Sequence, residues 1–118
     1  MSNNYRIPEK IEQRIRERDT SCVYCGKKML EQWPSDNSPT IEHLRETPPF
    51  KWGEGSEDER LKEEHLAICC WGCNRNRGAL NLLKWFPEEY CTNRNINKDT
   101  VAEPVKNYIK KYIEKSER

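Results

Sequence analysis

Two Cys-x-x-Cys pairs limit what this chain can fold into more than any other feature of its sequence. Cys22 and Cys25 flank Val-Tyr, Cys70 and Cys73 flank Trp-Gly, and 44 residues separate the two pairs. Each such turn directs two sulfurs toward one ion, and two turns complete a tetrahedral sulfur shell with zinc–sulfur distances of about 2.3 Å. We therefore predict one structural zinc ion bound by these four cysteines, and the long segment between the pairs must contain a small structure of its own.

The other two cysteines are expected to lie outside this site. Cys69 competes with Cys70 as a ligand, but only Cys70 repeats the spacing of the first pair, so Cys69 is predicted to be a small buried group. Cys91 is predicted to be a packing residue or a free thiol. Two disulfides are the alternative to metal. They are disfavoured because the first ten residues lack the apolar segment of a secretory signal. We expect a cytoplasmic protein, of bacterial or phage origin.

The composition indicates one small domain, residues 1–118, that needs such a metal staple. Hydrophobic residues make up 34% of the 118 residues and charged residues 35%, so the buried apolar area is small. No run of residues approaches the length of a transmembrane helix, and we expect no membrane association. The formal net charge is +1, and near −1 once zinc and four thiolates are counted. Binding of nucleic acid therefore requires a local basic surface.

Residues 70–84 supply a candidate for that basic surface. They contain Arg75, Arg77 and Lys84 and no acidic residue. Trp71 lies inside the second cysteine pair, where side chains tend to be exposed, and a tryptophan face can stack on a base. We predict that Arg75, Arg77 and Trp71 contact nucleic acid. The remaining tryptophans are predicted to fill the core: Trp33, Trp52 and Trp85.

Hydrophobic periodicity predicts an α+β chain with short strands. Isoleucines recur every four residues up to Ile15, which predicts an amphipathic helix over residues 8–18. The capping box of Ser56 and Glu59 predicts a short helix that ends near residue 64. The other expected elements are strands at 40–44 and 66–69, a helix at about 75–86, a polar loop at 91–99 and a helix at about 100–116.

Three polar residues stand beside the cysteine pairs in this arrangement. Glu42 and His43 belong to the first predicted strand, Asn74 directly follows Cys73, and a hairpin would bring that strand over the following helix. A carboxylate and an amide oxygen suit Mg²⁺ or Mn²⁺, and a neutral imidazole beside them can deprotonate water. A metal next to a general base is an arrangement for phosphodiester hydrolysis. Taken singly, a Glu-His pair is often ordinary surface and an asparagine often only caps a helix.

The order of these motifs resembles the HNH endonuclease family, which has a ββα-metal fold. The resemblance covers about residues 18–86 and rests on Cys22-Val-Tyr-Cys25-Gly26, Thr40-Ile41-Glu42-His43-Leu44 and the run from Leu66 to Gly78. It implies an α+β fold: a ββα-metal core, a four-cysteine zinc site and flanking helices at about 8–18 and 100–116. It also implies a metal-dependent endonuclease that hydrolyses phosphodiester bonds in nucleic acid, with DNA as the expected substrate.

The resemblance implies a role for each matching residue. His43 matches the general base that acts on water. Glu42, at a position that is usually Asp, and Asn74 match the ligands of the catalytic divalent metal, expected to be Mg²⁺ or Mn²⁺. His65 stands at a position that is usually Asn, where the family residue steadies the loop bearing the base. A second interpretation places His65 on the surface at a helix end, where the helix dipole favours it.

Two other function classes stay open at this point. One is a non-catalytic zinc module that binds nucleic acid or a protein, favoured by His65 in the middle position and by the near-neutral charge. The other is a zinc-stapled subunit of a larger complex, with the flanking helices as docking faces. The sequence leaves open DNA or RNA, strandedness, sequence specificity, biological role, and whether the protein is a monomer or a homodimer.

Overall fold

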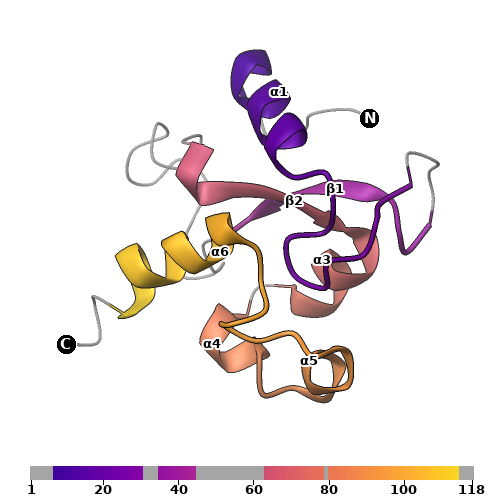
Figure 1. Ribbon diagram of the computed structural model, residues 1–118, viewed down its shortest axis with the longest axis vertical. Helices are drawn as coiled ribbons and strands as arrows, with labels where there is room; N and C mark the ends of the chain where they lie inside the picture. Colours follow the sequence, from indigo (N-terminus) through magenta and orange to yellow (C-terminus); the bar gives the residue numbers. More distant parts are fainter. Residues whose placement is uncertain (1–6, 31–34, 45–62, 79, 115–118) are drawn as a thin grey trace.

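The computed structural model describes residues 7–30, 35–44, 63–78 and 80–114 (Figure 1). These residues form a small α+β fold with one two-stranded antiparallel sheet. In chain order the elements are α1 (Glu9–Arg18), β1 (Pro39–His43), the 3₁₀ turn η1 (Glu63–His65), β2 (Leu66–Cys70), α3 (Trp71–Arg77), α4 (Leu82–Trp85), α5 (Glu89–Arg94), α6 (Glu103–Tyr108) and the π-helical turn η2 (Ile109–Glu114).

The two strands lie between α1 and α3 (Figure 1). They pair antiparallel, with Pro39 opposite Cys70 and His43 opposite Leu66. Because side chains alternate along a strand, Ile41 packs on the α1 side, whereas Thr40 and Glu42 make hydrogen bonds to α3. The predicted order of strand, strand and helix is therefore present, and it puts the α3 side chains against one face of β1.

Helix α1 is attached to β2 by two charged residues at its end. The Arg18 guanidinium donates hydrogen bonds of 2.7 and 2.8 Å to the Asp19 carboxylate, and a third of 2.7 Å to the Leu66 carbonyl. Asp19 Oδ2 in turn accepts from the Ile68 amide at 2.9 Å. Together with the apolar contact of Ile15, these bonds confirm the predicted amphipathic helix and fix its end beside the first cysteine pair.

The larger core lies on the other side of β2 and joins the C-terminal half of the chain to it. Trp85 is fully buried at its centre, meets Tyr24 edge to face at 5.0 Å between ring centroids, and donates from Nε1 to Asn76 at 2.9 Å. Trp85 is thus a core residue, as predicted, and Trp33 and Trp52 lie outside the described residues. The apolar side chains of α6 and η2 complete this core: Val105, Tyr108, Ile109 and Ile113.

The predicted single helix at 75–86 is wrong. Helix α3 begins earlier, at Trp71, and ends at Gly78, whose φ of 56° and ψ of −121° suit glycine and strain other residues. A new helix, α4, starts after Asn81, whose side chain accepts a hydrogen bond from the Leu83 amide at 2.9 Å. The break allows α4 to turn Trp85 into the core instead of continuing along the axis of α3.

The predicted polar loop at 91–99 is also wrong in its first half. Residues 89–94 form α5, which ends at Asn95 in the left-handed conformation and buries Cys91. The capping-box helix lies outside the described residues, except for Glu63 and Glu64 in η1. The last helix is present as α6 followed by η2. Among the described residues, no helix has the length and apolarity that a membrane span requires.

Candidate metal centre and adjoining polar cluster

The four cysteines of the two pairs meet at one point. The loop after α1 supplies Cys22 and Cys25, β2 ends with Cys70, and α3 supplies Cys73. Their sulfur atoms all lie within 4.8 Å of one another, and Cys25 Sγ is 3.9 Å from Cys70 Sγ. A tetrahedron with zinc–sulfur bonds of about 2.3 Å has sulfurs about 3.8 Å apart. The cluster can therefore hold a structural metal ion such as zinc.

Backbone hydrogen bonds shape the first cysteine turn. The Gly26 amide donates to the Cys22 carbonyl at 2.9 Å, and the Cys22 amide donates to the Lys27 carbonyl at 2.9 Å. Gly26 has a φ of 76°, which lets the chain reverse immediately after Cys25. The turn therefore directs both of its sulfurs toward the second pair.

The sulfur atoms are coupled electrostatically. Hydrogen bonds with Cys22 lower the pKa of Cys25 and lower that of Cys70 to about 7. The same kind of contact raises the pKa of Cys73, and the bond with Cys25 raises the pKa of Cys22. Four thiolates at this spacing repel one another. A bound cation offsets this repulsion because it attracts all four negative charges.

Tyr90 is a neighbour of this cluster that sequence reasoning missed. Its hydroxyl donates to Cys73 Sγ at 3.4 Å, and the Arg94 guanidinium lies 3.6 Å from the centroid of its ring. Outer-shell hydrogen bonds of this kind hold metal ligands in place. Both residues belong to α5, a helix that the sequence did not predict, and Arg94 lies in the predicted polar loop at 91–99, so no local pattern signalled the contact.

The two remaining cysteines lie outside the cluster, as the spacing predicts. Cys69 is fully buried on the side of β2 that faces α3, with its sulfur 3.7 Å from Thr40 Oγ1. Burial raises the pKa of Cys69 and raises that of Cys91 to about 12. Both thiols are therefore protonated at neutral pH and act as packing groups.

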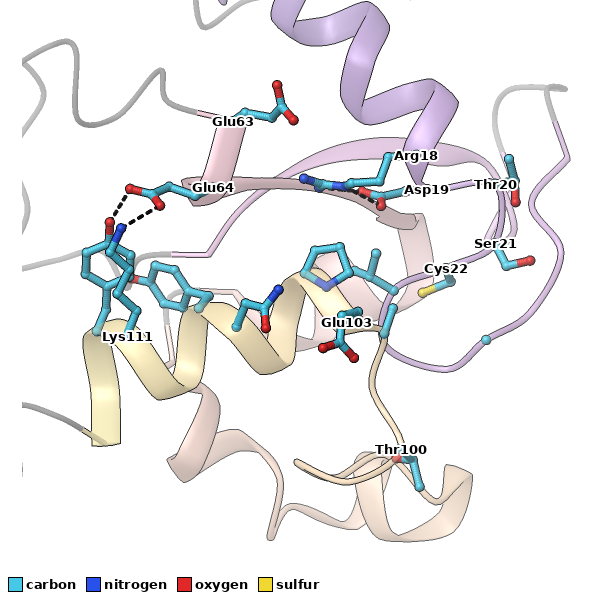
Figure 2. A pocket seen from close by; sticks show the side chains of 17 residues that line it. Arg18, Asp19, Thr20, Ser21, Cys22, Glu63, Glu64, Thr100, Glu103 and Lys111 are labelled. Atoms are coloured by element: carbon cyan, nitrogen blue, oxygen red, sulfur yellow. Dashed lines mark hydrogen bonds and ion pairs between the residues drawn. The ribbon is translucent and has the colours of Figure 1, made fainter.

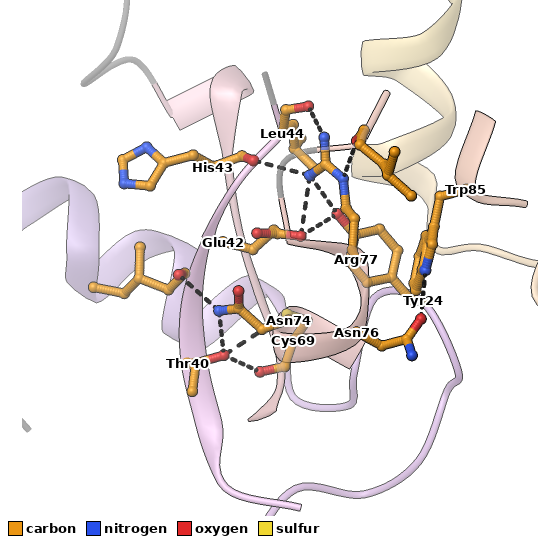
Figure 3. Close-up of polar contacts among 12 residues, drawn as sticks. Tyr24, Thr40, Glu42, His43, Leu44, Cys69, Asn74, Asn76, Arg77 and Trp85 are labelled. Atoms are coloured by element: carbon orange, nitrogen blue, oxygen red, sulfur yellow. Dashed lines mark hydrogen bonds and ion pairs between the residues drawn. The ribbon is translucent and has the colours of Figure 1, made fainter. Parts of the chain in front are cut away.

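A buried polar cluster lies between β1 and α3, next to the cysteines (Figure 3). Glu42 Oε2 accepts hydrogen bonds from the Tyr24 hydroxyl at 2.7 Å and from Arg77 Nη1 at 3.1 Å. Only 4% of Glu42 is exposed. Burial raises the pKa of Glu42 above its ordinary value, while the Arg77 charge and the Tyr24 hydroxyl oppose this rise. The positive charge of Arg77 therefore offsets the cost of burying the Glu42 carboxylate.

The prediction that Arg77 contacts nucleic acid is wrong. Only 2% of Arg77 is exposed, and its guanidinium also donates to the backbone carbonyls of His43 at 3.0 Å, Leu44 at 2.8 Å and Leu80 at 2.9 Å. Each of its three nitrogen atoms therefore donates to a partner inside the protein. The sequence could not show this, because a basic residue on a short helix faces solvent or core according to the packing alone.

Arg75 and Trp71 lie on the exposed part of the same helix. Arg75 forms an exposed ion pair with Asp36 at 2.9 Å, and its guanidinium lies 5.8 Å from the centroid of the half-buried Trp71 ring. These two side chains therefore form the part of α3 that another molecule can reach.

Asn74 is oriented by β1. Its side-chain nitrogen donates to Thr40 Oγ1 at 2.9 Å and to the Ile41 carbonyl at 3.3 Å. Since both protons of the amide point toward the strand, Oδ1 is the atom left to act as a ligand. The alternative that Asn74 caps the helix does not apply, because α3 begins at Trp71 after Cys70. Glu42 and Asn74 thus lie on the same side of β1.

His43 ends β1 on the other side of the strand. Alternation turns its imidazole away from the α3 face that Glu42 occupies, and Figure 3 shows the ring directed away from Arg77. The side chain is half-buried. Glu42 and Asn74 therefore share one side of β1, whereas the His43 side chain leaves the strand on the opposite side.

His65 is buried, so the interpretation of this residue as surface is wrong. Its ring packs against Tyr112 at 4.6 Å and Tyr108 at 5.7 Å between centroids, and 4% of the residue is exposed. Its backbone carbonyl accepts a hydrogen bond from the Leu44 amide at 3.0 Å. The residue that follows His43 is therefore held by the backbone of His65, while the His65 side chain anchors α6 and η2.

A groove of about 990 Å³ opens on another part of the molecule (Figure 2). Arg18 and the first cysteine turn form one wall, and Glu103 and Lys111 stand on the opposite one. Glu42, His43 and Asn74 do not line it. This groove and the predicted catalytic residues are therefore separate features.

Comparison of the chain with protein-family models, with curated proteins and with solved structures gave no match.

Proposed function

We propose that this protein is a metal-dependent endonuclease that hydrolyses phosphodiester bonds in nucleic acid, with DNA as its substrate. The observation that carries the proposal is the tie between Asn74 and β1, at 2.9 and 3.3 Å, beside Glu42. It joins the first half of β1 to the middle of α3, within a unit whose four clustered cysteines we take to bind zinc. This is the strand–strand–helix arrangement that the motif order implies.

The donor atoms fit a hard divalent cation. Tyr24 and Arg77 both bond to Glu42 Oε2, so we propose Oε1 as the carboxylate ligand atom, and the Asn74 amide offers Oδ1. Carboxylate and amide oxygens suit Mg²⁺ or Mn²⁺, and carboxylates that bind metals are commonly hydrogen-bonded through their other oxygen. When bound, the cation supplies electrostatic stabilisation of the charged transition state.

His43 is the proposed general base, and its direction is consistent with this role. In an in-line displacement the attacking water and the departing 3′ oxygen lie on opposite sides of phosphorus. A base on one side of the strand end and the Glu42–Asn74 pair on the other can therefore serve the two ends of the same reaction. A neutral imidazole takes the proton from water at near-neutral pH.

The exposed part of α3 is the proposed contact with the substrate. The Arg75 guanidinium can exchange its exposed partner Asp36 for a phosphate, and the Trp71 face beside it can stack on a base. Arg77 has no part in this contact, because its guanidinium is buried.

Cleavage of a supercoiled plasmid and of a labelled duplex tests the proposal. Purified protein is incubated with EDTA, Mg²⁺ or Mn²⁺, beside His43→Ala and Asn74→Ala. We expect cleavage only with added cation, a rate lowered by about 10²- to 10⁴-fold in His43→Ala, and a comparable loss in Asn74→Ala. Lys98→Ala is the matched control, because Lys98 is exposed in the loop after α5 and belongs to none of β1, η1 or α3.

Equal cleavage by wild type and His43→Ala, in preparations with one zinc per chain, would show that a contaminating nuclease or another residue is responsible. No cleavage by wild type of duplex DNA, single-stranded DNA or RNA with either cation would contradict the proposed activity.

A non-catalytic zinc module is the second candidate, and the burial of Glu42 favours it. With 4% exposure and an ion pair to Arg77, the carboxylate already has protein partners. This candidate predicts that DNA is bound without cleavage, with an affinity that falls as salt rises. Arg75→Ala would then weaken DNA binding. It would also reduce the slope of log affinity against log salt concentration by about the amount expected for one lost phosphate contact. His43→Ala would leave DNA binding unchanged.

A further inference from the structure

We infer that Tyr24 is a positioning residue that links the zinc site to the proposed cation site, an inference that rests on the proposed function. Tyr24 lies between Cys22 and Cys25, so its backbone belongs to the turn that carries two of the four sulfurs. Its hydroxyl is the donor to Glu42 Oε2 at 2.7 Å. One residue therefore spans the distance from the cysteine cluster to the carboxylate.

The surroundings of Tyr24 leave it little freedom to move. Only 2% of the residue is exposed, and its ring packs edge to face against Trp85 with 5.0 Å between centroids. Rotation of the Tyr24 side chain about its χ1 bond would take the ring out of a densely packed core. The position of the hydroxyl is therefore set by the position of the cysteine turn and by the core behind it.

The hydrogen bonds of the hydroxyl have a fixed direction. A phenol has one proton, and Tyr24 donates it to Glu42, while Arg77 Nη1 donates to the Tyr24 oxygen at 3.3 Å. Reversing either bond would leave a buried donor or acceptor without a partner, which is costly. The three groups thus fix Oε2 of Glu42 toward Tyr24 and Arg77 (Figure 3), and Oε1 is the proposed ligand atom.

A consequence follows for the two metal sites. Zinc bound by the four cysteines would hold the turn of residues 22–25 against residues 70–73, and through Tyr24 the same turn holds the Glu42 carboxylate. Removing the Tyr24 hydroxyl should leave zinc bound, because the sulfurs are unchanged, but should loosen Glu42. Affinity for the divalent cation would then fall without loss of zinc, which a merely structural role of Tyr24 does not predict.

The test compares wild type, Tyr24→Phe and Tyr112→Phe, all loaded with zinc. Tyr112 is the matched control, since its hydroxyl bonds Glu64 on the surface. Free Mn²⁺ is measured by electron paramagnetic resonance during titration, and zinc by mass spectrometry. We expect one zinc per chain in all three proteins and Mn²⁺ binding weakened by about 10- to 100-fold in Tyr24→Phe alone. The Mn²⁺ concentration that Tyr24→Phe needs for cleavage should rise in parallel.

Unchanged Mn²⁺ binding in Tyr24→Phe would overturn the inference and leave the proposed function standing. Absence of Mn²⁺ binding in wild type would overturn both. If Tyr24→Phe loses zinc, the wild-type protein labelled with 3-fluorotyrosine decides the matter. The fluorine resonance of Tyr24 is assigned by replacing each of the other four tyrosines in turn. A Mg²⁺-dependent shift of that resonance supports the link, and an unmoved resonance overturns it.

Discussion

The guanidinium of Arg77 holds together the end of β1 that carries Glu42 and His43. It pairs with Glu42 at 3.1 Å and donates to the carbonyls of His43 and Leu44, at 1% side-chain exposure. Folding removes both charges from water. Loss of either partner therefore leaves the other charge buried and unpaired, which lowers the stability of the fold. Arg77 therefore matters for the stability of the site more than for contact with a ligand.

Arg77→Met is expected to lower the free energy of unfolding by about 3 to 5 kcal/mol, because it leaves the Glu42 charge buried without its partner. Arg75→Met, on the same helix but in an exposed ion pair, should cost less than about 1 kcal/mol. Urea unfolding of the zinc-loaded proteins measures both.

The double variant Arg77→Met with Glu42→Leu provides the internal check. It removes the uncompensated charge and should recover part of the loss. A double variant that is less stable than Arg77→Met would show that the backbone hydrogen bonds of Arg77, rather than the ion pair, account for the effect.

At the scale of the elements, η1 is tied to η2 by polar contacts at the surface. Glu64 accepts hydrogen bonds from Lys111 Nζ at 2.8 Å and from the Tyr112 hydroxyl. Beneath this contact, His65 packs on Tyr108 and Tyr112. The C-terminal elements are therefore attached to the start of β2 by an aromatic layer, with the charged pair outside it.

The Glu64 contact predicts a small dependence of stability on acid pH. Hydrogen bonding to Lys111, and then to Tyr112, lowers the pKa of Glu64 in the folded protein. A lowered pKa contributes stability that is present above the unfolded value of about 4.3 and lost as pH falls through the folded value. Because the pair is exposed, Glu64→Gln should lower the melting temperature at pH 7 by only roughly 1 to 3 °C.

Thermal unfolding of both proteins across pH measures this contact. The difference between wild type and Glu64→Gln should shrink below the ordinary glutamate pKa and vanish once the wild-type carboxyl is protonated. High salt should also reduce it, since the pair is screened. A difference that persists in acid would mean that the glutamate acts through packing rather than charge.

At the scale of the whole molecule, the four cysteines join two parts of the chain that a small core alone holds weakly. Residues 22–25 and 70–73 meet at the sulfur site, and the Val23 amide donates to the Ile68 carbonyl at 3.3 Å beside it. With 34% hydrophobic residues in 118, the apolar core contributes a limited stabilisation. A bound metal contributes folding free energy directly, on the order of 10 kcal/mol in zinc-finger peptides.

We therefore expect one zinc per chain and loss of the cooperative unfolding transition when a strong chelator removes it. Cys22→Ser and Cys73→Ser should purify with little zinc and show this loss without a chelator. Cys69→Ala and Cys91→Ala should retain one zinc each, because these thiols lie outside the cluster. Mass spectrometry for zinc and circular dichroism measure the outcome. Full zinc content in Cys73→Ser, or its loss in Cys69→Ala, would contradict the ligand assignment.

The sequence by itself determined the features that depend on spacing and local pattern. The two Cys-x-x-Cys turns identified the four clustered sulfurs, and the choice of Cys70 over Cys69 followed from repeated spacing. Periodicity found α1, both strands and the C-terminal helix within a few residues. The break at Gly78 and helix α5 were missed. Each depends on a short segment docking against the core, and short helices carry too few turns to show a periodic signal.

Tertiary structure alone decided which side chains face each other. It turned Arg77 inward to Glu42, brought the Tyr24 hydroxyl to Glu42 and the Tyr90 hydroxyl to Cys73, and packed buried His65 against Tyr112. The hydrogen-bonded pairs among these contacts lie 17 to 35 positions apart in the chain, and each contact depends on where an element docks. Burial of a charged or polar side chain is favourable only when its partner is already in place. Which residue becomes that partner depends on how the chain packs, and no local sequence pattern indicates it.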